Sequence, residues 1–178
     1  VILAGIGKSG LIARKISATL SSIGVPSFFC DPAQAIHGDM GQIEKKDILL
    51  VFSYSGNTPE LANMLKYANR YRIKIIGVAS KPESILLKAS DIKLVLPKVK
   101  ESDPTGMVPT SSTSLALLLG DCLATTVMSL RKFSKEKFKI FHPGGNIGKS
   151  LLLAKDIMVT GKKMPTIDFK KNFKEALK

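Results

Sequence analysis

The chain has 178 residues, of which 44% are hydrophobic and 23% charged, and this length and composition suit one domain with a substantial core. Its formal net charge of +13 at pH 7 comes mostly from lysines spread along the chain, which has no Trp and few aromatic residues. A solvated basic surface is therefore favoured over nucleic-acid binding. No apolar run approaches the length of a membrane span and no basic-then-apolar leader opens the chain, so we expect a cytoplasmic protein without a membrane partner.

Hydrophobic periodicity predicts strands that alternate with helices along most of the chain. Apolar runs typical of buried strands lie at residues 1–6, 25–30, 47–53, 74–79 and 92–96. Helical spacing lies at residues 9–23, 59–72, 84–89, 111–130 and, over a shorter stretch, 147–153. Because this alternation is typical of parallel sheets covered by helices on both faces, we expect an α/β fold with a five-stranded parallel sheet.

The two ends of the sequence predict a fragment. The chain opens inside the first predicted strand and stops inside a new amphipathic pattern at residues 172–177. We therefore expect part of a longer protein, with any helix before the first strand missing. The character of the sequence changes after Ala154, which predicts one domain over residues 1–154 and a linker into an incomplete second domain over residues 155–178.

A serine-rich segment, Ser53-Tyr54-Ser55-Gly56-Asn57-Thr58, lies between the third predicted strand and the helix that begins at Pro59. The first N–H groups of a helix lack intrahelical partners and the helix dipole favours negative charge, so such a position suits an anion. Hydroxyl groups add donors, and glycine lets the backbone approach a ligand closely. We predict that this loop binds the phosphate of a small molecule through Ser53, Ser55, Gly56, Asn57 and Thr58.

A second glycine-rich turn, Gly5-Ile6-Gly7-Lys8-Ser9-Gly10, follows the first predicted strand and opens a helix. With Asp31 downstream it matches the dinucleotide-binding pattern, so a nicotinamide-dependent dehydrogenase stays open as an alternative. Lys8 and Ser9 instead suit a terminal phosphate, and a dinucleotide site needs no second phosphate loop. ATP hydrolysis is excluded, because neither Gly-Lys-Ser sequence of the chain has a glycine five residues before its own glycine.

Four residues are candidates for acid–base chemistry. The only two histidines, His37 and His142, lie in glycine-containing loops, and loop residues on a rigid scaffold carry function more often than core residues. Glu60 and Glu101 are candidate carboxylates. Glu60 could as well interact with a helix dipole, and Glu101 could be an ordinary loop carboxylate.

Neither a disulfide framework nor a metal site is indicated. Cys30 and Cys122 are far apart in apolar surroundings and neither has a CxxC partner, so we expect two buried free thiols. Cys, His and carboxylate residues do not cluster at the spacing of metal ligands, so we expect no catalytic metal.

Five motifs occur together and in order, Gly5-Ile6-Gly7-Lys8-Ser9-Gly10, His37-Gly38-Asp39, Ser53-x-Ser55-Gly56, Pro109-Thr110-Ser111-Ser112-Thr113 and His142-Pro143-Gly144-Gly145. With them, residues 1–154 closely resemble the sugar isomerase (SIS) domain of arabinose 5-phosphate isomerases. Residues 155–178 resemble the start of the paired cystathionine-β-synthase (CBS) module that follows the SIS domain in that family. The resemblance implies the flavodoxin-like α/β sandwich of SIS domains.

The resemblance also implies a reaction and a set of site residues. The family interconverts ribulose 5-phosphate and arabinose 5-phosphate, which feeds synthesis of the 3-deoxy-octulosonate sugar of lipopolysaccharide, and is expected to use no redox cofactor and no obligatory metal. Its catalytic positions fall on Lys8, Glu60, Glu101 and His142, with His37 among the substrate-binding residues. It further implies a homodimer or homotetramer whose subunits share residues of each site.

The chemistry of such an isomerase fits these residue types. Moving a proton between C1 and C2 through an enediolate requires a carboxylate base, a group that stabilises the oxyanion and a proton shuttle. Either glutamate could be the base, with Lys8 as the stabilising group and His142 as the shuttle. A non-catalytic sugar-phosphate sensor, of the kind found in transcriptional regulators, uses the same loops and stays open as an alternative.

Two positions depart from the pattern of the family. Tyr54 and Asn57 stand where some relatives carry Asn and Glu, which would alter the fit of the substrate. Asp31 stands at a position that is linked to zinc inhibition in relatives with His, so we do not extend zinc inhibition to this chain.

Overall fold

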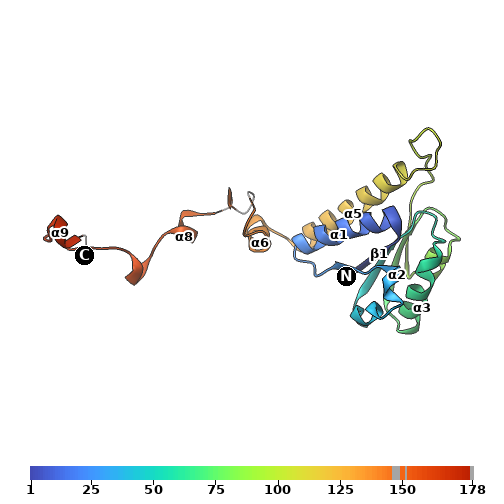
Figure 1. The fold of residues 1–178 in the computed structure, drawn as a ribbon, viewed down its shortest axis with the longest axis horizontal. Helices are drawn as coiled ribbons and strands as arrows, with labels where there is room; N and C mark the ends of the chain where they lie inside the picture. Colours follow the sequence, from blue (N-terminus) through green and yellow to red (C-terminus); the bar gives the residue numbers. More distant parts are fainter. Residues whose placement is uncertain (146–148, 151, 177–178) are drawn as a thin grey trace.

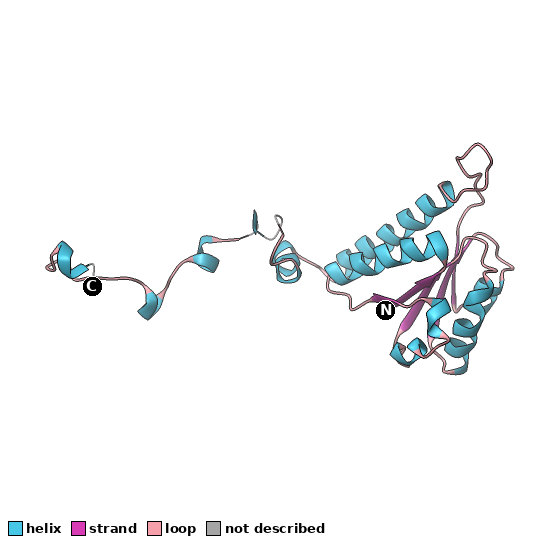
Figure 2. Ribbon diagram, viewed as in Figure 1, coloured by secondary structure: helices cyan, strands magenta, loops and turns pink. Residues whose placement is uncertain are grey.

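The computed structural model describes residues 1–145, 149–150 and 152–176. At its centre is a parallel sheet of five strands in the order β2-β1-β3-β4-β5, drawn in magenta in Figure 2. The strands are β1 Ile2–Gly5, β2 Phe28–Phe29, β3 Ile48–Phe52, β4 Lys74–Ala79 and β5 Ile92–Val95. The predicted α/β fold with a five-stranded parallel sheet is confirmed.

Helices cover both faces of the sheet (Figure 1). One face carries α1 Gly7–Ser22 and α5 Ser111–Leu130, and the other carries α2 Pro32–Ala35, α3 Ala62–Arg70 and α4 Ile85–Ala89. Side chains alternate between the faces along a strand. In β3, Leu50 and Phe52 therefore pack with α1, while Leu49 and Val51 pack with α3.

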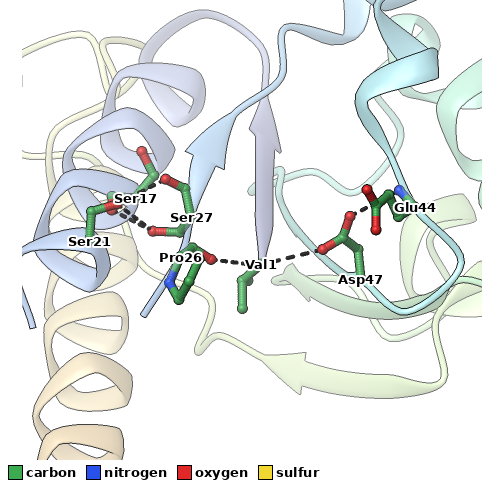
Figure 3. Close-up of polar contacts among 7 residues, drawn as sticks. All are labelled: Val1, Ser17, Ser21, Pro26, Ser27, Glu44 and Asp47. Carbon is green, nitrogen blue, oxygen red and sulfur yellow. Dashed lines mark hydrogen bonds and ion pairs between the residues drawn. The ribbon is translucent and has the colours of Figure 1, made fainter. Parts of the chain in front are cut away.

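The second strand is shorter than the predicted strand 25–30. Pro26 has no N–H to give to a ladder, and the carbonyl of Pro26 accepts a hydrogen bond from the Val1 nitrogen at 2.8 Å. Ser27 is held by α1, because its hydroxyl donates to the Ser17 carbonyl at 2.7 Å and its carbonyl accepts from the Ser21 hydroxyl at 2.8 Å (Figure 3). Only two residues are left to pair with β1.

Helix boundaries also differ from the predicted ones. The first helix begins at Gly7, two residues early. The helix predicted at 59–72 begins as the 3-10 turn η2 Pro59–Leu61 and ends as α3 at Arg70. Two short helices, α2 and η1 Asp39–Gln42, occupy the glycine-punctuated segment after β2.

Helix α5 corrects two expectations. It is 20 residues long and, by length and composition, apolar enough to cross a membrane, whereas we expected no run of that kind. It packs along α1 with Ala116, Gly120 and Ala124 buried, as part of the globular unit. Cys122 lies on its outer side and is exposed, so only Cys30 of the two thiols is buried, and burial raises the pKa of Cys30.

After α5 the chain leads away from the sheet (Figure 1). It forms α6 Lys135–Phe141, which the periodicity did not predict, and then α8 Ala154–Ile157, the 3-10 turn η3 Gly161–Lys163 and α9 Phe173–Ala176. The side chains described in residues 152–175 are exposed. Of the helix predicted at 147–153, residues 147, 148 and 151 lie outside the described part of the chain, residues 149–150 are helical, and residues 152–153 are not.

Candidate active site

A cavity of ≈ 520 Å³ lies at the carboxyl ends of the strands. Its walls come from segments that follow β1, β3 and β5 and from the start of α5. The chain leaves β1 toward β2 and leaves β3 toward β4, so the two connections diverge from neighbouring strands. Ligands of open parallel sheets bind at such a switch point, and the volume is within the range of small-molecule sites.

The first wall is the start of α1, where Lys8 and Ser9 line the cavity. This helix has no side-chain cap at its N-terminus and no acidic residue in its first turn, so its first N–H groups and its dipole favour an anion. The glycines let the helix begin this close to the sheet. A Cβ on Gly10 would lie 2.6 Å from the Gly5 carbonyl oxygen, and Gly7 has a left-handed φ of +57°.

The second wall is the serine loop after β3, in which Ser53, Ser55 and Thr58 line the cavity. The hydroxyls of Ser53 and Thr58 are 2.8 Å apart, and the Ser53 hydroxyl also accepts the Gly56 N–H at 3.2 Å. These contacts fold the loop into a tight turn. Three predicted phosphate-binding side chains are thus brought to one cavity together with Lys8 and Ser9.

Gly56 and Asn57 face away from this cavity. A Cβ on Gly56 would lie 2.2 Å from the Ser84 hydroxyl, and its φ is +68°. The Asn57 side chain accepts a hydrogen bond from the Ile85 N–H at 2.9 Å. Both residues therefore dock the loop onto the start of α4, and in this chain they support the loop rather than line the cavity.

Glu101 reaches the cavity from the segment after β5 and caps α5. One of its carboxylate oxygens accepts the N–H groups of Thr110 at 2.8 Å and Ser112 at 3.2 Å and lies 3.1 Å from the Thr110 hydroxyl. Hydrogen bonds to the charged form stabilise it. The Ser112 side chain, followed by the Thr110 N–H, lowers the pKa of Glu101 from 4.5 to about 2.

This cap predicts a pH-dependent stability. Because the pKa of Glu101 is lower in the folded than in the unfolded chain, its stabilising effect is complete above about pH 4.5 and is lost as the pH falls toward about 2. We expect Glu101→Gln to lower the melting temperature near neutral pH, with the difference from the parent shrinking as the pH is lowered. Glu83→Gln, at an exposed carboxylate, is the control. A difference that stays constant with pH would contradict the cap.

The other three predicted acid–base residues lie outside the cavity of this chain. Glu60 is exposed in η2, two residues after Thr58, and His37 is exposed after α2. His142 follows α6 and stacks on Phe138, with ring centroids 3.7 Å apart. The neighbouring Phe141 packs on Gly24 beyond the last turn of α1, about 24 Å along that helix from Lys8.

Asp31, on which the dehydrogenase alternative depends, has a local role. Its carboxylate accepts the Ala33 N–H at 2.9 Å and so caps α2, and it lies 4.0 Å from the Arg14 guanidinium. Residues 1–145, 149–150 and 152–176 bring together no group of three or more His, Cys, Asp or Glu side chains that could hold a metal ion.

Four cavity residues with polar side chains were not among the predicted site residues. Lys100, Ser112 and Thr113 line the cavity beside Glu101, and Tyr54 lines it beside Ser53. Lys100 could have been found from its position, because it adjoins the candidate carboxylate Glu101 in the segment after the fifth strand. The cavity thus holds two lysines and one carboxylate, a positive balance that suits an anionic ligand.

Comparison with known proteins agrees with this geometry. The family model of the SIS domain matches residues 1–126. The chain belongs to the SIS domain family. It is 44% identical over 168 residues to arabinose 5-phosphate isomerase KdsD of Pseudomonas aeruginosa, which covers 94% of this chain and 52% of that protein. An uncharacterized protein of Rickettsia prowazekii is 44% identical over 177 residues, which cover 99% of this chain and 55% of the relative.

Solved SIS structures have the same fold. An Escherichia coli CFT073 protein, solved in complex with arabinose 5-phosphate, aligns with a TM-score of 0.78 and 35% identity over 80% of this chain and 76% of that one. The SIS chain spans about half the length of the curated relatives it matches.

Proposed function

We propose that the chain is the SIS domain of a cytoplasmic isomerase that interconverts ribulose 5-phosphate and arabinose 5-phosphate, in the synthesis of 3-deoxy-octulosonate for lipopolysaccharide. The observation that carries the proposal is the cavity itself, where two uncapped helix starts, two lysines and a carboxylate meet. The isomerases among its relatives and the arabinose 5-phosphate complex of a similar structure support this choice of sugar.

The phosphate group is assigned to the serine loop. The hydroxyls of Ser53, Ser55 and Thr58 and the N–H groups at the start of η2 suit an anion. Lys8, at the start of α1, is placed to stabilise the negative charge that develops on the enediolate oxygen. The sugar then lies between the two loops, toward Lys100 and Glu101.

The base is assigned to Glu60 rather than Glu101. Because Glu60 lies outside the cavity lining of one chain, it is assigned, like the two histidines, to a site completed by a neighbouring subunit. A general base works best when its pKa is near the working pH, whereas the pKa of Glu101 is about 2 and one of its oxygens already accepts several hydrogen bonds. Glu101 is assigned to hold the start of α5 and to add negative charge beside the sugar hydroxyls. His142, as the proton shuttle, and His37 are assigned to a neighbouring subunit of a homodimer or homotetramer.

We further propose a division of the chain at residue 154. Residues 1–154 form the SIS domain, and residues 155–178 are the linker and start of a CBS module. The greater length of the curated relatives supports a protein with further domains.

The proposal is tested by incubating the protein with ribulose 5-phosphate in deuterated solvent, with and without NAD. We expect arabinose 5-phosphate that has gained solvent deuterium at C2, at a rate independent of NAD. Binding without turnover or hydrogen exchange would favour the sensor instead. A requirement for NAD would favour the dehydrogenase.

A further inference from the structure

Tyr54 lines the cavity but has no part in the chemistry proposed above. Its half-buried phenol reaches the segment that follows β5. The hydroxyl accepts the Val99 N–H at 2.8 Å, and the carbonyl oxygens of Pro97 and Val99 lie 3.3 Å and 3.5 Å away. A phenol can donate one hydrogen bond as well as accept, so this hydroxyl is saturated by the backbone of one short segment.

The backbone of Tyr54 is held in place as well as its side chain. Its carbonyl oxygen accepts hydrogen bonds from both the N–H and the hydroxyl of Ser80, each at 2.8 Å. Ser80 directly follows β4. One residue therefore ties the loop after β3 to the ends of β4 and β5.

The segment that Tyr54 holds, residues 97–110, has few other attachments. The last backbone hydrogen bond to the sheet comes just before it, from the Leu96 N–H to the Ala79 carbonyl at 2.9 Å. Val99 is followed by Lys100 and Glu101, which line the cavity, and Glu101 in turn holds the start of α5. A shift at Val99 would therefore move both charged side chains relative to the serine loop.

We propose that Tyr54 is a positioning residue that sets the distance of Lys100 and Glu101 from the phosphate-binding loop. The inference rests on the function proposed above. It predicts that Tyr54 acts on the geometry of the reacting sugar, whose phosphate stays on the serine loop. Loss of the hydroxyl should then affect turnover more than affinity, because small displacements of groups around a reacting centre cost rate.

The test is Tyr54→Phe, which keeps the ring and removes the hydroxyl. We expect kcat to fall about tenfold or more while KM changes less than about threefold, since chemistry is more sensitive to placement than binding. The amide exchange of Val99, followed by NMR, should become faster because its acceptor is gone. Tyr71→Phe, the same change at the end of α3, is the control and should alter neither quantity.

Each possible outcome either supports or overturns the positioning role of Tyr54. Faster Val99 exchange with an unchanged kcat would overturn it, as would an equal loss of kcat in Tyr71→Phe. If the unmodified protein turns over no pentose phosphate, the proposed function has failed separately, and the amide exchange of Val99 then decides. Faster exchange of Val99 in Tyr54→Phe alone would support the positioning of the segment after β5, and unchanged exchange would overturn it.

Discussion

Glu60→Gln is expected to lower kcat by about a hundredfold or more, the usual contribution of a general base. Glutamine keeps the shape of the side chain but cannot remove a carbon-bound proton. Affinity for the sugar phosphate should remain, because a base acts on the barrier and not on the ground state. Exchange of the substrate hydrogen with deuterated solvent should stop together with turnover, and both are measured on the same sample.

Two variants make this prediction specific. Glu83→Gln removes an exposed carboxylate that pairs with Lys88 at 3.2 Å, and it should leave turnover unchanged. Glu101→Gln should retain measurable hydrogen exchange, because a carboxylate with a pKa of about 2 is a poor base. Loss of exchange in Glu101→Gln but not in Glu60→Gln would reverse the assignment of the two residues.

Mixing two inactive variants should restore activity if subunits share sites. Lys8 lines the cavity, whereas His142 lies beyond the far end of α1. In a heterodimer of Lys8→Ala and His142→Ala subunits, one site keeps both side chains and the other loses both. For random pairing in equal amounts, the mixture should recover about a quarter of the parent activity, because half the dimers are mixed and each has one intact site.

The control pairs two defects from the same cavity. Lys8→Ala mixed with Glu101→Ala leaves every site with one defect, so the mixture should show no more activity than the two variants measured separately. Native mass spectrometry verifies that hetero-oligomers form in both mixtures. Failure to recover activity in verified Lys8→Ala and His142→Ala hetero-oligomers would show that His142 does not serve a neighbouring site.

The sheet and the position of the cavity could be predicted from local sequence patterns. Buried runs such as 47–52 alternate with helical spacing, and the carboxyl ends of parallel strands meet at one edge. Lys8, Ser53 and Thr58 follow such strands directly, so their meeting was predictable. Glu101 was identified for its charge, but its cap on α5 depends on a turn through residues 102–109 that no periodicity describes.

What could not be predicted depends on contacts between distant segments. Asn57 is a residue type that is common in ligand-binding loops. Its side chain nevertheless accepts a hydrogen bond from the Ile85 N–H, 28 residues away in the sequence. The exposure of Cys122 depends on which side of α5 meets α1, since the apolar pattern of that helix extends around much of its surface. His142 was identified from a motif, and a motif carries no information on distance from the cavity.

The close contact between α1 and α5 connects the wall of the cavity to a position outside it. A Cβ on Gly120 would lie 2.0 Å from Cδ1 of the fully buried Ile16, so the helices touch where no side chain separates them. Both helices begin at the cavity, and Ser112 lies only about 12 Å along α5 from this contact. A larger residue at position 120 would require Ile16 or one of the two helices to shift. A substitution there would thus act on the wall of the cavity from a position that does not itself line it.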